Sequence, residues 1–208
     1  MHGPPESGPS LTNAPCGVPK RLARAVTPRA ACSAGLARFN PSGNALPMFD
    51  SACSWEADTM LGTRGGYKAR LLVCVERVSR YARLALLDNG LPETAAAAVG
   101  QHLVGDDRWP VLSITTDRGS EFATLHTVLV PDRLYVCDAR RPNQRGSNEN
   151  TIGLIRQFIP KGEPLSLQTQ QSIAEIERLL NNRPRACLGF RTPAELLFDS
   201  RSQCRDSN

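Results

Sequence analysis

Short blocks of apolar residues, interrupted by turn residues, run through the middle of the chain. Segments 55–61, 69–78 and 81–87 are rich in Leu, Val and Ala, and Gly- or Ser-containing turns separate them, which is typical of short β-strands. Because the connections between these segments are short, we expect an antiparallel meander. The run 111–116 is a short apolar block of the kind that forms a buried parallel strand.

Helical signals alternate with these strands. Pro92 opens an alanine-rich run that continues to Leu103, which predicts a helix before the strand at 111–116. A strand, a crossover helix and a parallel strand together imply a mixed sheet. After a further strand at 133–137, Ser147 can cap a helix that runs to about residue 159.

The last third of the chain shows helical spacing of its apolar residues. Ile173, Ile176 and Leu180 lie three and four residues apart and predict a helix over 167–180, and Pro193 opens a short helix as far as residue 198. For the helix that begins at Ser147, the expected core face consists of Ile152, Leu154, Ile155, Phe158 and Ile159.

Two side-chain expectations follow from the strand pattern. Trp55 lies on an apolar strand and is expected in the core. Glu76 and Arg77 are neighbours, for which we expect an ion pair on a strand face with little energetic weight.

The first fifty residues differ from the rest of the chain. They are rich in Pro, Gly, Ser and Ala and show no sustained apolar period. Such a segment buries too little apolar surface to offset its ordering entropy. We therefore expect a disordered extension over 1–50, a folded core over 51–200 and a flexible tail over 201–208.

The charge of the chain does not by itself indicate a partner. The formal net charge is +5, but residues 1–50 hold five basic and two acidic residues and so contribute three of these charges. Position is more informative than the sum, because clustered cations are the usual footprint of phosphate binding. Basic residues gather around the helix after Ser147, at Arg140, Arg141, Arg145, Arg156 and Lys161.

Cysteine and histidine spacing excludes some classes of protein. Seven cysteines and three histidines contain no Cys-x-x-Cys pair, so a zinc finger or zinc knuckle is not expected, and reduced thiols are the simplest interpretation. No segment approaches the roughly twenty apolar residues that a membrane helix needs. We expect a bacterial protein of the cytoplasm without a membrane partner.

Three carboxylates stand where elements of the expected fold begin or end. Asp58 lies on the first strand, Asp117 ends a buried strand just before Gly119, and Glu149 lies in a first helical turn. Mg²⁺ and Mn²⁺ prefer oxygen ligands, and three carboxylates can hold two such ions. Taken singly, each acid has an ordinary alternative: a surface acid at Asp58, a turn at Asp117 and a dipole partner at Glu149.

Several motifs stand in one order along the chain: Trp55-Glu56-Ala57-Asp58, Val75-Glu76-Arg77-Val78-Ser79-Arg80, Thr116-Asp117-Arg118-Gly119-Ser120-Glu121-Phe122, the block 144–162, and Asn181-Asn182-Arg183-Pro184 followed by Thr192-Pro193-Ala194-Glu195. In these motifs the chain, from about residue 55 to about residue 198, resembles the catalytic core of the insertion-sequence-thirty family of bacterial transposases. These proteins are relatives of retroviral integrases and have a ribonuclease-H-like fold.

The resemblance implies a fold and an activity. The fold would be an α/β, ribonuclease-H-like mixed sheet flanked by helices. The activity would be metal-dependent DNA cleavage and strand transfer at the ends of an insertion sequence. DNA ends, target DNA and further copies of the chain would be the partners. The triad would be Asp58, Asp117 and Glu149, holding two divalent cations, Mg or Mn.

The resemblance also implies contacts with DNA. Arg156 follows Glu149 by seven residues, two helical turns along the same face, where related enzymes place a basic residue against the terminal DNA. Arg145, Asn148 and Lys161 are expected to contact the phosphate backbone as well.

The chain also departs from the family pattern. Arg118 follows Asp117 where the family usually has Asn, and residues 1–50 do not resemble the helix-turn-helix region that precedes the core in complete relatives. A catalytically silent DNA-binding remnant is therefore an alternative to an active transposase. An ordinary ribonuclease-H-like nuclease, which cuts RNA in RNA–DNA hybrids, is a third interpretation.

Overall fold

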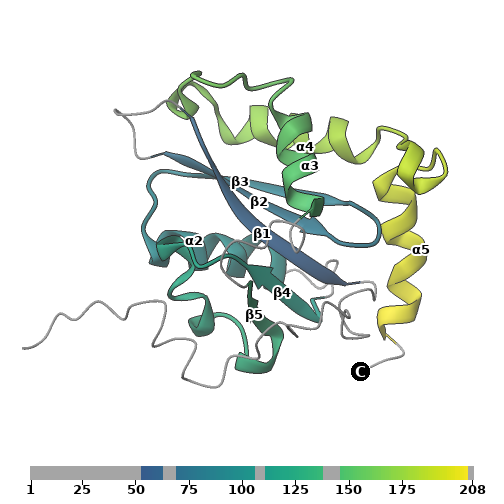
Figure 1. Ribbon diagram of the computed structural model, residues 1–208, viewed down its shortest axis with the longest axis horizontal. Helices are drawn as coiled ribbons and strands as arrows, with labels where there is room; N and C mark the ends of the chain where they lie inside the picture. The colour runs from purple at the N-terminus through teal and green to yellow at the C-terminus, as the bar shows by residue number, and fades with distance from the viewer. Residues whose placement is uncertain (1–52, 63–68, 106–110, 138–145, 206–208) are drawn as a thin grey trace, which may run out of the picture.

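A five-stranded mixed sheet runs through the centre of the protein (Figure 1). The structure is a computed structural model that describes residues 53–62, 69–105, 111–137 and 146–205, with side chains as far as residue 199. The disordered extension expected over 1–50 lies outside the described residues. Among those residues, no helix is both long enough and apolar enough to cross a bilayer.

The strands follow the order β3-β2-β1-β4-β5 across the sheet. β1 pairs antiparallel with β2, and β2 pairs antiparallel with β3, so the expected meander is confirmed. β1 pairs parallel with β4, and β4 pairs parallel with β5, which confirms the mixed sheet. The strands are β1 (Ser54–Leu61), β2 (Arg70–Glu76), β3 (Ala82–Leu87), β4 (Ser113–Thr116) and β5 (Leu134–Val136).

Helices cover both faces of the sheet (Figure 1). α2 packs on one face, and α3 and α4 pack on the other. α2 is followed directly by a π-helical turn, Gly100–Val104. The helices are α2 (Pro92–Val99), α3 (Gly146–Ile155), α4 (Gln170–Asn181) and α5 (Pro193–Arg205). α5 continues beyond residue 200, where a flexible tail was expected.

Alternation along the strands divides the apolar residues between two cores. Trp55 and Ala57 of β1 belong to the core under α2, and Trp55 is fully buried, as expected. Met60, on the opposite face of β1, packs in the core under α3 and α4. Each fully buried large side chain contributes about 1.5–3 kcal/mol to stability, so both faces fix the strand register.

The start of α4 differs from the expected boundary at residue 167. Thr169 caps the helix: its hydroxyl accepts a hydrogen bond from the backbone N–H of Ser172, and the Ser172 hydroxyl accepts one from the backbone N–H of Thr169. This reciprocal cap holds Thr169 outside the helix. Leu167 therefore lies before α4 and is 71% exposed.

The end of α3 also differs from expectation. The helix stops at Ile155, and the N–H groups of Gln157 and Phe158 bond to carbonyls three residues back instead of four. This tighter turn rotates the side chains that follow. Ile159 is still buried, but Phe158 is 40% exposed, so its expected place in the core is wrong.

The cysteines do not all match the expectation of reduced thiols. Cys74, Cys137 and Cys187 are free, whereas Cys53 is disulfide-bonded. Complete burial raises the pKa of the Cys74 thiol to about 12. This thiol therefore stays protonated at neutral pH.

Candidate active site

The parallel register of β1 and β4 brings two of the expected acids to neighbouring positions. Ala57 pairs with Thr116, and Asp58 and Asp117 are the next residues along the two strands. Trp55 and Ala57 face the α2 core, so alternation turns Asp58 toward the side of the sheet that α3 covers. Both aspartates are half-buried.

Local hydrogen bonds orient each aspartate. Asp58 Oδ1 accepts a bond of 2.8 Å from the backbone N–H of Thr59. Asp117 Oδ1 accepts a bond of 2.7 Å from the backbone N–H of Gly119, which closes a tight turn directly after β4.

Gly119 leaves no room for a side chain in this turn. An added Cβ would lie 2.8 Å from Asp117 Oδ1 and 2.7 Å from Glu121 Oε2, closer than real Cβ contacts. The glycine therefore lets both carboxylates approach the backbone of the loop.

We expect Gly119→Ala to lower the free energy of unfolding by about 1–3 kcal/mol, because the two carboxylates must move aside. Gly153→Ala is the matched control, since an added Cβ there meets nothing within 4 Å and Gly153 lies inside α3. This control should stabilise by about 0.5–1 kcal/mol. Urea unfolding measures both, and equal effects of the two changes would contradict the crowding at position 119.

Glu121 anchors the loop after β4 to the sheet. Its Oε1 accepts a 2.6 Å hydrogen bond from the Thr59 hydroxyl, and the same oxygen lies 2.8 Å from Arg70 Nη1. The loop that follows Asp117 is thus fastened to β1 and β2 beside Asp58. The sequence does not reveal this role of Glu121, because its partners Thr59 and Arg70 lie 62 and 51 positions away and no local pattern encodes such contacts.

Glu149 lies in the first turn of α3, as expected, and its side chain is exposed. Within the described ranges, no group of three His, Cys, Asp or Glu side chains forms a cluster that could hold a metal ion. The structure therefore brings Asp58 and Asp117 to neighbouring strand positions without gathering Glu149 into one cluster with them.

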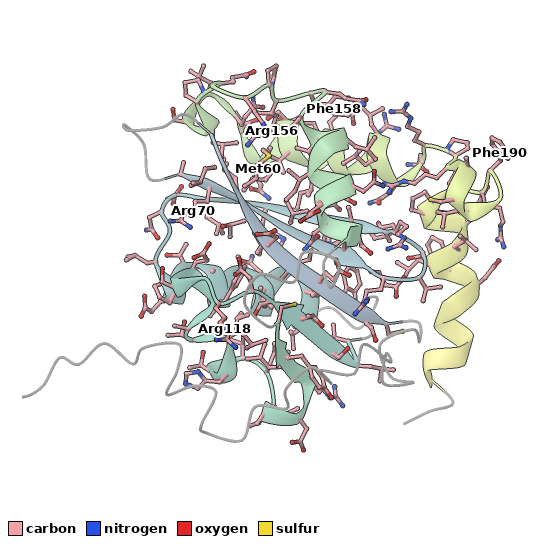
Figure 2. All side chains as sticks on the ribbon, viewed as in Figure 1. Met60, Arg70, Arg118, Arg156, Phe158 and Phe190 are labelled. Atoms are coloured by element: carbon pink, nitrogen blue, oxygen red, sulfur yellow. The ribbon has the colours of Figure 1, made fainter. Side chains whose placement is uncertain are left out.

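The expected phosphate contacts differ in their surroundings. Arg145 lies outside the described residues, and Lys161 is exposed. Arg156 donates from Nη2 to the carbonyl of Leu61 at 2.7 Å, which holds the guanidinium against the end of β1, beside Met60 (Figure 2).

Asn148 does not fit a direct phosphate contact in this structure. Its side chain is 0% exposed, and its amide atoms have no hydrogen-bond partner among the described residues. Its backbone N–H is directed into the protein instead, where it donates to Glu56 Oε2 at 3.1 Å.

A buried carboxylate, Glu56, lies beneath the start of α3. It is 1% exposed, and its Oε1 lies 3.3 Å from Arg77 Nε. Burial raises the pKa of the Glu56 carboxyl, while the Arg77 guanidinium and the N–H of Asn148 oppose that rise. The sequence did not single out Glu56, although a charged residue on the inward face of an apolar strand is a usable signal.

The surroundings of Glu76 and Arg77 differ from the weak strand-face ion pair that was expected. Glu76 is fully buried and accepts hydrogen bonds from the backbone N–H groups of Cys53, Val78 and Ser79 and from the Ser79 hydroxyl. Arg77, in the turn that follows β2, forms an ion pair with Glu56 of β1. Both acids therefore organise the interior at the turn between β2 and β3.

Arg118, which follows Asp117, contacts the strand next to β4. Its Nε donates a long hydrogen bond of 3.4 Å to the carbonyl of Cys137, at the end of β5. This contact draws the guanidinium toward the neighbouring strand.

The strand order and the flanking helices define a fold of the ribonuclease-H-like class, the fold of integrase cores. The structure superposes on the catalytic core domain of BIV integrase with a TM-score of 0.55 and 18% identity, over 73% of this chain and 97% of that chain. At this level of identity the similarity establishes the fold, which confirms the expected fold class.

Sequence comparison specifies the family. The chain is 38% identical over 145 residues to Transposase InsI for insertion sequence element IS30A of Escherichia coli (strain K12). It is 37% identical over 149 residues to the transposase for insertion sequence element IS1086 of Cupriavidus metallidurans. Each match covers 69% of this chain, and no family model matches. The chain belongs to the insertion-sequence-thirty family of transposases.

The chain is shorter than these relatives. The matched residues make up 37% of the Escherichia coli protein and 42% of the Cupriavidus protein, so the chain spans less than half of their length.

Proposed function

We propose that the chain is a metal-dependent polynucleotidyl transferase that cleaves DNA at the ends of an insertion sequence and joins them to target DNA. Asp58, Asp117 and Glu149 are the proposed metal ligands. The observation that carries the proposal is the parallel register of β1 and β4, in which Asp58 and Asp117 directly follow the paired residues Ala57 and Thr116. Membership of the transposase family supports the same reaction.

The donor set fits two divalent cations, Mg or Mn. Carboxylate oxygens are the ligands these ions prefer, and both aspartates are half-buried at the surface rather than sealed in a core. Two carboxylates about 4 Å apart repel by roughly 4 kcal/mol at an effective dielectric constant near 20, so bound cations would stabilise their close approach. When bound, such ions assist the attacking and the leaving oxygen of a phosphodiester.

The residues of the chain position the reactants and do not react covalently. In the first step, water attacks the phosphodiester at the element end and releases a 3′ hydroxyl. In the second step, that hydroxyl attacks a target phosphodiester in line, and the target's own 3′ oxygen leaves. The protein forms no covalent intermediate, so Asp58, Asp117 and Glu149 are proposed to act only as ligands.

Cationic side chains around α3 are proposed to hold the DNA backbone. Arg156 lies on the turn that follows α3, Lys161 follows it on the surface, and Arg145 precedes the helix. Phosphate contacts of this kind position the duplex without reading its sequence. We further propose that several copies of the chain assemble on the DNA ends, in the bacterial cytoplasm.

Arg156→Ala is expected to weaken binding to terminal DNA and to reduce the slope of log affinity against log salt by about one, because one phosphate contact is lost. Arg133→Ala is the matched control. Arg133 also donates to a backbone carbonyl, that of Val111, but lies beside β5 at the far edge of the sheet. Fluorescence anisotropy over a salt series measures both slopes, and an unchanged slope for Arg156→Ala would exclude this contact.

A direct test uses the full chain with labelled duplexes that carry element ends, with Mg²⁺ or Mn²⁺. Nicked and joined products on a denaturing gel, lost on chelation, are the expected result. Duplexes without an element end serve as the control. Cleavage of the RNA in RNA–DNA hybrids without any joining would favour the ordinary nuclease instead.

A second candidate is a catalytically silent DNA-binding protein. It is favoured by the finding that no metal-holding group of three ligands is assembled in the ranges the structure describes. This candidate predicts DNA binding that does not depend on divalent cations and no product in the nicking assay.

A further inference from the structure

Glu56 connects β1, which carries Asp58, with α3, which carries Glu149; both acids belong to the proposed triad. It precedes Asp58 by two positions in β1, so both side chains point to the same face of the strand. Its Oε2 accepts a 3.1 Å hydrogen bond from the backbone N–H of Asn148, the residue directly before Glu149 in α3. One carboxylate therefore connects the strand of Asp58 to the helical turn of Glu149.

This hydrogen bond meets a specific need of the helix. The first four N–H groups of an α-helix have no partner within the helix, and α3 begins at Gly146. The N–H of Asn148 is one of these groups, and it is completely buried. A carboxylate is also favoured there by the positive end of the helix dipole.

Glu56 is itself held from a second direction. Its Oε1 lies 3.3 Å from the Nε of Arg77, which directly follows β2, and the side chain of Glu56 is 1% exposed. Arg80, in the turn after β2, donates to the hydroxyl of Ser147 and so forms another link to the first turn of α3. A buried carboxylate with two fixed partners has little freedom to move.

We propose that Glu56 is a positioning residue, whose carboxylate holds the first turn of α3 against β1 and so sets the distance between Glu149 and Asp58. The inference rests on the proposed function, in which both acids bind the same cations. Glu56 is not assigned as a metal ligand, because its two oxygens are directed to Arg77 and Asn148.

The alternative is a purely structural role, in which Glu56 only stabilises the fold. Glu76 provides the matched control, because it is equally buried and also accepts hydrogen bonds from backbone N–H groups, but holds the turn between β2 and β3. Losing either acid lowers stability. Only the loss of Glu56 should change how the site binds a cation.

The experiment measures Mn²⁺ binding to the full chain without DNA, from the loss of the free-ion signal in electron paramagnetic resonance. We expect Asp117→Asn to lose Mn²⁺ binding. Glu56→Ala should weaken Mn²⁺ binding at least about tenfold, the effect typical of losing a residue that orients metal ligands. Glu56→Gln keeps an acceptor for the N–H of Asn148 and should bind close to wild type. Glu76→Gln should also bind close to wild type, despite a lower melting temperature.

Glu56→Ala could misfold, because it removes the carboxylate that faces the half-buried Arg77 guanidinium, so a double variant is tested beside it. Glu56→Leu combined with Arg77→Met removes both charges at similar volume, a replacement that cores often tolerate. The double variant should fold, show faster hydrogen exchange in the first turn of α3, and bind Mn²⁺ as weakly as Glu56→Ala.

The outcomes separate the inference from the proposed function. If the wild-type chain binds no Mn²⁺, both fail. If wild type binds but Glu56→Ala and the double variant bind equally well, the inference alone is overturned. The same holds if Glu76→Gln weakens binding as much as Glu56→Ala, or if Glu56→Gln loses the cation as fully as Glu56→Ala.

Discussion

Asp117→Asn is expected to reduce nicking and joining of element-end DNA by roughly a thousandfold, about 4 kcal/mol of activation free energy. The substitution removes the negative charge that a cation requires but keeps the shape of the side chain. The amide oxygen can still accept the 2.7 Å bond from the N–H of Gly119, so the turn after β4 should persist. Initial rates on labelled duplexes at saturating Mg²⁺ measure the effect.

The matched control for this change is Asp132→Asn. Asp132 is an exposed acid in the short turn Pro131–Arg133, on the same half of the sheet but away from β1. It should leave the rate unchanged. If Asp117→Asn is as active as Asp132→Asn, then Asp117 does not take part in the reaction, and the proposed metal-dependent mechanism is wrong.

The largest effect on stability is expected for Glu76→Ala, a loss on the order of 3–5 kcal/mol in the free energy of unfolding. Glu76 receives hydrogen bonds from three backbone N–H groups and one hydroxyl, and most of these donors are buried. Truncation would leave them without a partner and without access to water. Urea unfolding followed by circular dichroism measures the loss.

Glu175→Ala is the comparison for Glu76→Ala. Glu175 also carries a charge and pairs with Arg178 at 2.6 Å, but both side chains are more than half exposed. Solvent screens such pairs, and no measurable change in stability is expected. Similar losses for the two variants would mean that burial does not determine the contribution of Glu76.

The parts of the fold that could be predicted depend on short-range patterns. Strands β1, β2 and β3 follow from apolar segments separated by turns, and β4 follows from an apolar block before Asp117. A buried strand and a parallel neighbour then place an acid within β1 close to an acid that directly follows β4. This reasoning led to Asp58 and Asp117, and their adjacent positions agree with the observed register.

The partners of buried charged groups could not be predicted in this way. Glu56 meets the N–H of Asn148 across 92 positions of sequence, and no local pattern encodes such a pair. Arg77 lies beside Glu76 in the chain, yet its ion pair is with Glu56. Pairing by sequence proximity failed here because the pairing of β1 with β2 brings the turn residue Arg77 against Glu56 of β1.

Helix ends were the other source of error, since they depend on single hydrogen bonds. Thr169 and Ser172 cap α4 later than the apolar spacing suggested. The tight turn after Ile155 exposes Phe158, although its spacing from that residue suits a helix face. A periodic pattern indicates which residues face inward only as long as the helix continues.

The alternation of β1 makes its length more critical than its composition. Glu56, Asp58 and Met60 face α3, while the residues between them face α2. An insertion or deletion of one residue before Asp58 in β1 would reverse the alternation. Asp58 would then point into the apolar core under α2. Insertions and deletions among transposases related to this chain should therefore fall outside β1.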